Sequence, residues 1–369
     1  MSWWSDDADD DPEFDESDVR VRPNPKGNRP RTKTRPEHAK AVHGMVLIVD
    51  RGRYTVLLDA GEESGGKKSG GETEDTNSDG VRVTATQARE LGRKSIVTGD
   101  RVALVGDTSG AEGSLARIVR VEERSTLLRR SADDTDTVER VIVANADQML
   151  IVVAAANPEP RIRLVDRYLV AAFDARLTPI LCITKTDLAD PSEFLAHFDG
   201  LDLIVVTSRS DAPPLDEIAK LLVGHVTVAV GHSGVGKSTL VNALVPDAHR
   251  AVGHVNEVTG RGRHTSSSSI CLRFTAPEGI VAPGSGSRTG WIIDTPGVRS
   301  FGLGHVDTNH LIDAFGDLAR IAEECPRGCT HLPDAPDCAM NEAVASGALD
   351  ARGAVRLDSL QRLIATLKD

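Results

Sequence analysis

Hydrophobic and polar residues follow different periods in successive parts of the chain. Between about residues 41 and 121, β-branched runs alternate with polar positions and turn residues, a pattern that predicts strands. The expected strands cover residues 42–49, 53–58, 81–85, 100–105 and 113–121. Five short strands in one segment fit a small closed barrel such as an OB-fold. The Gly/Ser-rich insert 61–80 is expected to be a loop between two strands.

From residue 125 onward, continuous apolar runs alternate with stretches of helical period. Strands that are buried on both faces read as apolar runs, so this alternation predicts a parallel sheet with helices on both sides. The expected strands cover residues 149–155, 179–183, 203–206, 226–230, 270–274 and 291–293. The expected helices lie at 162–173, around Phe194, at 215–222 and at 239–244. A Gly/Ser-rich loop at 279–290 carries no evident chemistry.

Past residue 308 the pattern is helical and surrounds a cluster of cysteine and histidine. Cys325, Cys329, His331 and Cys338 supply three thiolates and an imidazole, the set for a closed, structural Zn²⁺ site. A chance cluster of free thiols is the alternative. The last helix is expected to carry the apolar residues Val355, Leu357, Leu360, Leu363, Ile364 and Leu367. The remaining cysteines, Cys182 and Cys271, are expected to be small core residues.

The length of 369 residues predicts two or three domains. No apolar run approaches the ~18 residues of a membrane span, and the first residues lack the pattern of a signal peptide. We therefore expect a cytoplasmic protein without a membrane partner. Of the net charge of −12, the first eighteen residues carry nine negative charges, and a basic arm follows from Arg20 to Lys40. The arm either binds phosphate backbones or is a solvated, disordered tail.

A phosphate-binding loop follows the apolar run 226–230. Residues 231–238 fit G-x-x-x-x-G-K-[ST] between a predicted strand and a predicted helix, which is the context that this motif requires. Lys237 is expected to neutralise phosphate oxygens, and Ser238 to bind Mg²⁺. The predicted phosphate-binding residues are Gly231, His232, Ser233, Gly234, Val235, Gly236, Lys237, Ser238 and Thr239. The loop does not choose between ATP and GTP.

The tetrad Thr184-Lys185-Thr186-Asp187 matches the guanine-reading motif [NT]-K-x-D. The Asp187 carboxylate accepts hydrogen bonds, and guanine offers two donors that adenine lacks, while the stem of Lys185 can cover the base. Thr207 and Ser208, at the end of the next strand, are expected to support the base through a backbone N–H. On its own, the tetrad also fits a helix N-cap.

Asp294 ends an apolar strand and begins D-x-x-G, in which Gly297 is expected to sense a γ-phosphate. The basic segment 260–266 is the candidate switch, with Thr265 as the second residue to bind Mg²⁺. Val298 stands where a hydrolytic GTPase often has a water-positioning Gln. His264 is the candidate substitute; alternatively, it is only a polar residue of the switch.

The order of the motifs along the chain narrows the choice of protein family further. The guanine reader lies upstream of the phosphate loop, and D-x-x-G follows both, whereas ordinary guanine-nucleotide switches begin with the phosphate loop. The chain therefore resembles the circularly permuted bacterial ribosome-assembly GTPases of the ribosome small-subunit-dependent GTPase A family. The resemblance covers residue 42 to the C-terminus and includes the barrel, the Gly-Arg-His-Thr switch segment, Asp-Thr-Pro-Gly-Val-Arg-Ser-Phe-Gly and the cysteine cluster.

This resemblance implies three folded parts and a tail. The tail covers residues 1–40, an OB-fold barrel 41–124, a circularly permuted α/β P-loop GTPase domain 125–304, and a helical zinc-binding domain 305–369. The implied partners are GTP and GDP, the small (30S) ribosomal subunit and its rRNA, and the expected protein is a monomer. Such proteins act late in maturation of the subunit and hydrolyse GTP faster on it.

Three features depart from the family pattern. Thr184 replaces the usual Asn of the guanine reader. The spacing between the first two cysteines of the cluster is one residue shorter than the common pattern, and the last spacing is longer. The charged N-terminus is unusually long. The alternative function is a GTP-regulated RNA-binding module with negligible turnover. An ATPase or kinase is disfavoured by Asp187.

Overall fold

The computed structural model describes residues 38, 40–59, 80–92, 95–131, 139–246, 269–295, 301 and 303–367. Several predictions lie outside the described residues: the charged tail, most of the insert 61–80, and the site residues His264, Thr265 and Gly297. One compact unit extends from Lys40 to Asp369. No helix in the described part is long and apolar enough to cross a membrane.

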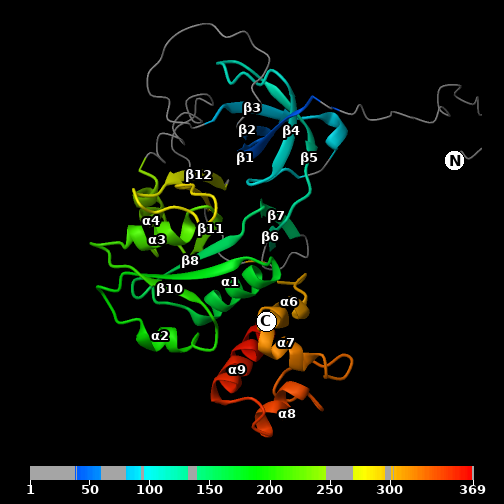
Figure 1. Cartoon of the computed structure of the whole chain (residues 1–369), viewed down its shortest axis with the longest axis vertical. Coiled ribbons are helices and arrows are strands. Elements are labelled where there is room, and N and C mark those ends of the chain that lie inside the picture. The colour runs from blue at the N-terminus through cyan, green and yellow to red at the C-terminus, as the bar shows by residue number, and fades with distance from the viewer. Residues whose placement is uncertain are drawn as a thin grey trace, which may run out of the picture. The chain divides into compact units, whose positions relative to one another are not determined.

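The five strands expected at the start of the chain are confirmed and close into a barrel (Figure 1). β1 pairs with β2 and β4, β3 pairs with β2 and β5, and β4 pairs with β5, so the ring has no open edge. Alternate residues, such as Val56, Leu104 and Ile118, fill its interior. The barrel contains β1 (Val42–Asp50), β2 (Arg53–Leu58), β3 (Arg82–Gln87), the 3₁₀ helix η2 (Arg89–Leu91), β4 (Arg101–Gly106) and β5 (Ala116–Val121).

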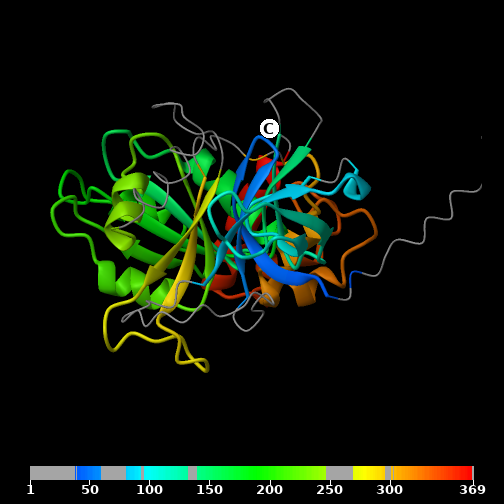
Figure 2. The same cartoon turned by 90° about the horizontal axis from the view of Figure 1, so that it is seen from above.

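The apolar runs of the middle segment form the predicted sheet, in the order β10-β9-β8-β11-β13-β12. Its strands are β8 (Gln148–Ala154), β9 (Thr178–Thr184), β10 (Ile204–Thr207), β11 (Val226–Gly231), β12 (Ile270–Thr275) and β13 (Thr289–Asp294). All are parallel except β12 (yellow in Figure 2), which runs antiparallel to β13 and also pairs with β1, where Ile270 lies opposite Ile48. A connection of 13 residues, 276–288, joins β12 and β13 as a hairpin.

Helices cover both faces of this sheet because successive residues of each strand face opposite ways. Met149 and Ile151 of β8 pack into one core cluster with α1, whereas Leu150 and Val152 pack into another with α3 and α4. Figure 1 shows α1 on one side of the strands and α3 and α4 on the other. The helices are α1 (Ile162–Asp174), α2 (Ser192–Ala196), α3 (Leu215–Leu222) and α4 (Lys237–Leu244).

The sequence patterns did not reveal the hairpin of β6 (Leu127–Ser131) and β7 (Glu139–Ala144). Its register shifts between Leu128 and Arg129, so the alternation that marks a strand is broken after two residues. The hairpin precedes β8 and forms a separate two-stranded sheet.

The C-terminal segment is helical, as predicted, with α6 (Thr308–Asp313), α7 (Gly316–Ala322), α8 (Ala339–Ala345) and α9 (Ala351–Thr366). Of the apolar residues that α9 carries, Leu357, Leu360, Leu363 and Ile364 are buried in the core. Val355 is 49% exposed. Two residues along a helix turn the side chain by about 200°, which places Val355 on the opposite side from Leu357.

We expect two truncations in α9 to have different effects on stability. Leu360→Ala should lower the free energy of unfolding by about 2–5 kcal/mol, because Leu360 is fully buried in the core. Val355→Ala in the same helix should change it by less than about 0.5 kcal/mol. Chemical denaturation followed by circular dichroism measures both. Equal losses would contradict this packing.

Candidate nucleotide site and metal centre

The phosphate loop joins the end of β11 at Gly231 to the start of α4 at Lys237. A Cβ atom on Gly231 would lie 2.5 Å from the carbonyl oxygen of Val152 on the neighbouring strand, so only glycine fits. Gly234 and Gly236 have φ of +82° and +93°, a backbone conformation that strains other residues. The three glycines of the motif are therefore required by its local geometry.

Lys237 and Asp294 are brought together from the two predicted phosphate-site motifs. β11 and β13 are parallel neighbours with Ala229 opposite Asp294, so both strands end at the same edge of the sheet. The Lys237 ammonium forms an ion pair with the Asp294 carboxylate and donates a hydrogen bond to the Thr295 carbonyl at 3.3 Å. Ser238 follows in the first turn of α4 with an exposed side chain.

The guanine reader contacts the phosphate loop directly. Thr184, the last residue of β9, donates its hydroxyl to the Val235 carbonyl at 2.5 Å. The Lys185 ammonium donates to the neighbouring carbonyl of Gly234 at 2.8 Å and also to the Asn157 carbonyl. Two adjacent residues of the guanine reader, Thr184 and Lys185, therefore donate hydrogen bonds to two adjacent carbonyls of the phosphate loop.

Asp187 lies beside the loop that follows β10. Its carboxylate accepts a 2.7 Å hydrogen bond from the Ser210 N–H, and this bond lowers the pKa of Asp187, which keeps it an ionised acceptor. Ser208 is buried and exchanges backbone bonds with the reader: its N–H donates to Ile183 and its carbonyl accepts from Thr186. Thr207, at the end of β10, is exposed.

Sequence reasoning missed Asn157, which contributes its backbone carbonyl, and Ser210, which contributes chiefly its backbone N–H and also its side chain. A backbone group leaves no trace in residue type. The signal that points to both is their position just past the carboxyl ends of β8 and β10, beside the predicted motifs.

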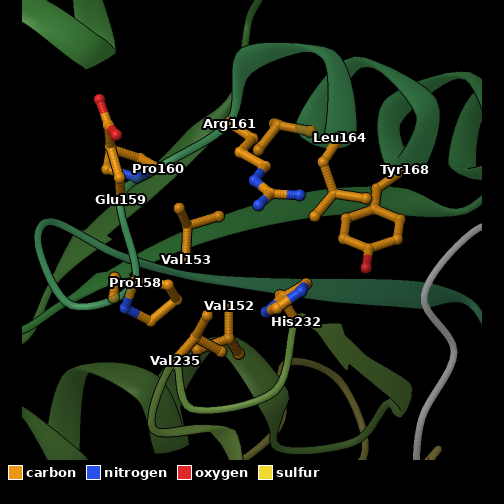
Figure 3. A pocket seen from close by; sticks show the side chains of 12 residues that line it. Val152, Val153, Pro158, Glu159, Pro160, Arg161, Leu164, Tyr168, His232 and Val235 are labelled. Carbon is orange, nitrogen blue, oxygen red and sulfur yellow. The ribbon is translucent and has the colours of Figure 1, made fainter.

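A small pocket lies between the phosphate loop, β8 and α1 (Figure 3). Figure 3 shows Pro158, Leu164 and the imidazole of His232 around it. Its volume of about 20 Å³ holds about one water molecule, too little for a nucleotide. The side chain of His232, predicted to bind phosphate, lines this pocket, and its Nδ1 lies 2.9 Å from the Ser233 carbonyl oxygen.

The predicted zinc residues converge in the C-terminal segment. One ligand atom from each of Cys325, Cys329, His331 and Cys338 lies within 4.8 Å of the others. The Sγ atoms of Cys325 and Cys338 are 4.0 Å apart, as are Cys338 Sγ and His331 Nδ1. Ligands on a tetrahedral Zn²⁺ at ~2.3 Å would be about 3.8 Å apart, so the cluster can hold one zinc ion.

Hydrogen bonds from α8 and α9 position the zinc-binding loop. Gln361 of α9 donates to the His331 carbonyl at 3.0 Å and to the Asn341 side chain at 2.8 Å. Asn341 of α8 donates to the Leu332 carbonyl at 2.9 Å. Burial raises the pKa of the Cys329 thiol to about 11, so a bound cation is needed to hold it as a thiolate at neutral pH.

Burial also lowers the pKa of His331, which favours the neutral imidazole that metals bind. The donor set, its spacing and the braced loop therefore all fit a structural zinc site. No carboxylate belongs to the cluster.

The phosphate loop, the guanine reader and Asp294 all lie at the carboxyl ends of the parallel strands. Their permuted order along the chain, together with this sheet, defines a circularly permuted P-loop GTPase. The family model of the RsgA GTPase matches residues 121–304. A Pseudomonas aeruginosa protein is 34% identical over 287 residues, which cover 74% of this chain and 77% of the relative. A Chlorobaculum parvum protein is 34% identical over 78% of this chain and 90% of its own length. Both are named small ribosomal subunit biogenesis GTPase RsgA.

Two solved structures have a similar fold. YjeQ from Thermotoga maritima matches with a TM-score of 0.59 and 24% identity, over 89% of this chain and 99% of its own. YloQ, described as a circularly permuted GTPase, matches with a TM-score of 0.57 and 22% identity, over 90% and 97%. The chain belongs to the RsgA GTPase family, and its activity is GTP hydrolysis.

We expect the cysteine cluster to bind about one zinc ion per chain. Cys338→Ser should lose most of the bound zinc and lower the thermal stability, because metal binding contributes to local folding. Cys182→Ala is the matched control: this cysteine is buried in β9 outside the cluster, so its removal should leave the zinc content unchanged. Elemental analysis of protein purified without chelators measures both. Absence of zinc from the wild type would contradict the assignment.

Proposed function

We propose that this protein is a GTPase that acts in maturation of the small ribosomal subunit, binds that subunit and its rRNA, and hydrolyses GTP faster on it. The observation that carries the proposal is the pair of hydrogen bonds from Thr184 and Lys185 to the phosphate loop, which makes one nucleotide site from two separated motifs. The names of the relatives support the ribosomal role.

In the proposed site, Asp187 accepts hydrogen bonds from guanine, and the loop containing Thr207 and Ser208 supports the base. The amides of the phosphate loop and the Lys237 ammonium bind the phosphates. Mg²⁺ would be held by Ser238 and, from the switch segment, by Thr265, and it would neutralise the phosphate oxygens. Asp294 would lie beside the ion, which requires Lys237 to exchange this carboxylate for phosphate. Gly297 would sense the γ-phosphate.

The catalytic assignment rests on sequence. Lys237 stabilises charge on the phosphates, while Thr265 and His264 belong to the switch segment. Because Val298 cannot orient water, we assign that role to His264, with a ribosomal group as the alternative supplier. In either arrangement the intrinsic rate is slow and rises when the subunit orders the switch.

The barrel is proposed to contact rRNA. On neighbouring strands, Arg53 of β2 is opposite Thr86 of β3, and Thr86 is opposite Arg117 of β5. Both arginines are exposed, so this row presents two cations and a hydroxyl on the outer face of the barrel. Such groups bind phosphates and sugar hydroxyls. The proposed protein is a cytoplasmic monomer, with one structural Zn²⁺ in its C-terminal domain.

Hydrolysis of GTP and ATP, with and without purified small subunits, tests this proposal. We expect slow hydrolysis of GTP alone, a rise of about tenfold or more with subunits, and no comparable hydrolysis of ATP. Thr275→Ala serves as a control variant, because this exposed residue ends β12 outside the site. His264→Ala should remove the stimulation and leave GTP binding intact.

One result would contradict the proposed function, and another would contradict only the assignment of His264. Tight binding to subunits without added turnover would favour the GTP-regulated RNA-binding module. A stimulated rate that survives His264→Ala would leave the function intact and transfer the catalytic role to a ribosomal group.

A further inference from the structure

We propose that Thr184 is a positioning residue for the phosphate loop and that this protein reads guanine without a hydrogen bond to N7 of the base. This inference deepens the proposed function and rests on its guanine site. In this arrangement Thr184, the first residue of the reader motif, contacts the phosphate loop and not the nucleotide.

The Thr184 side chain is turned toward the protein. Its residue is 7% exposed, and its hydroxyl lies 2.5 Å from the Val235 carbonyl oxygen and 3.2 Å from the Val153 carbonyl oxygen. Threonine has one hydroxyl proton, and both neighbours are acceptors only. That proton is therefore committed to backbone carbonyls, with the shorter contact to the phosphate loop.

This contact orients the loop. A trans peptide is planar, so the carbonyl of Val235 and the N–H of Gly236 point in opposite directions. Because the carbonyl faces Thr184, the Gly236 N–H faces away from it, toward the side that the proposed site assigns to the phosphates. Gly236 also packs against Thr184: a Cβ atom at this glycine would lie 3.6 Å from the Thr184 hydroxyl oxygen.

The same contact removes Thr184 from base recognition. N7 of guanine is a hydrogen-bond acceptor, so it needs a donor from the protein. An asparagine carries two N–H donors on one nitrogen, and one can hold the loop while the other serves the base. Threonine has no second donor. Discrimination therefore falls to Asp187, which accepts from the guanine N–H groups and does not sense N7.

Affinities for GTP and 7-deaza-GTP, in which a carbon replaces N7, test the inference directly. The wild type should bind the two nucleotides with affinities within about twofold of each other. Thr184→Asn supplies the missing donor and should prefer GTP by roughly two- to tenfold, the value of one hydrogen bond. This ratio compares two ligands on one protein, so a general loss of stability does not change it.

The positioning role is tested by removing the hydroxyl. Thr184→Val keeps the shape and leaves the Val235 carbonyl without its donor, so both nucleotides should bind more weakly by the same factor, about tenfold. Thr184→Ser retains the hydroxyl and should restore binding to near the wild-type value. Thermal unfolding of the variants shows whether each is folded.

A wild-type preference for GTP over 7-deaza-GTP of about fivefold or more would overturn the inference, because some group would then donate to N7. Unchanged affinity in Thr184→Val would overturn the positioning role. Failure of the proposed function has a different signature, the absence of a rate increase with small subunits, which the nucleotide ratios do not measure.

Discussion

Hydrogen bonds between two consecutive reader residues and two consecutive carbonyls of the phosphate loop join the two halves of the nucleotide site. Thr184 and Lys185 lie 51 and 49 residues before their partners, Val235 and Gly234. The rest of the proposed site depends on this junction, because it fixes the distance between the groups assigned to the base and those assigned to the phosphates. It also ties the reader to the loop amides that receive the nucleotide.

The junction forms because the motifs follow parallel strands of one sheet: the reader follows β9 and the phosphate loop follows β11, with β8 between these two strands. β8, β9, β11 and β13 all point the same way, and their carboxyl ends meet at one edge, where ligands of open α/β sheets bind. The places of the strands in the sheet, rather than their order along the chain, decide which motifs meet. Circular permutation changes the connections and leaves the site intact.

The C-terminal helices share a core with the same GTPase domain. Phe301, a few residues past D-x-x-G, is fully buried. Its ring packs edge-on against the ring of Tyr168 of α1, with the ring centroids 5.6 Å apart, and its carbonyl accepts a hydrogen bond from Arg167. Leu360 of α9 belongs to this core cluster as well. Phe301 is thereby anchored in the core that the C-terminal helices share.

Most of the architecture could be predicted because it depends on periodicity. Strands buried on both faces and an amphipathic α1 leave strong patterns, and the phosphate loop leaves glycines that the geometry at Gly231 requires. Features set by tertiary contacts could not be predicted. The hairpin of β6 and β7 has a broken register, and Ser210 meets Asp187 chiefly through its backbone N–H, so neither leaves a clear pattern in the side chains.

The most direct test of the guanine site exchanges donors and acceptors at Asp187. Asp187→Asn replaces an acceptor with a side chain that also donates, and xanthine carries an oxygen where guanine carries its amino group. The account predicts that this variant binds GTP about tenfold or more weakly and gains affinity for XTP, measured with purified protein. Unchanged affinity for both nucleotides in the variant would contradict it.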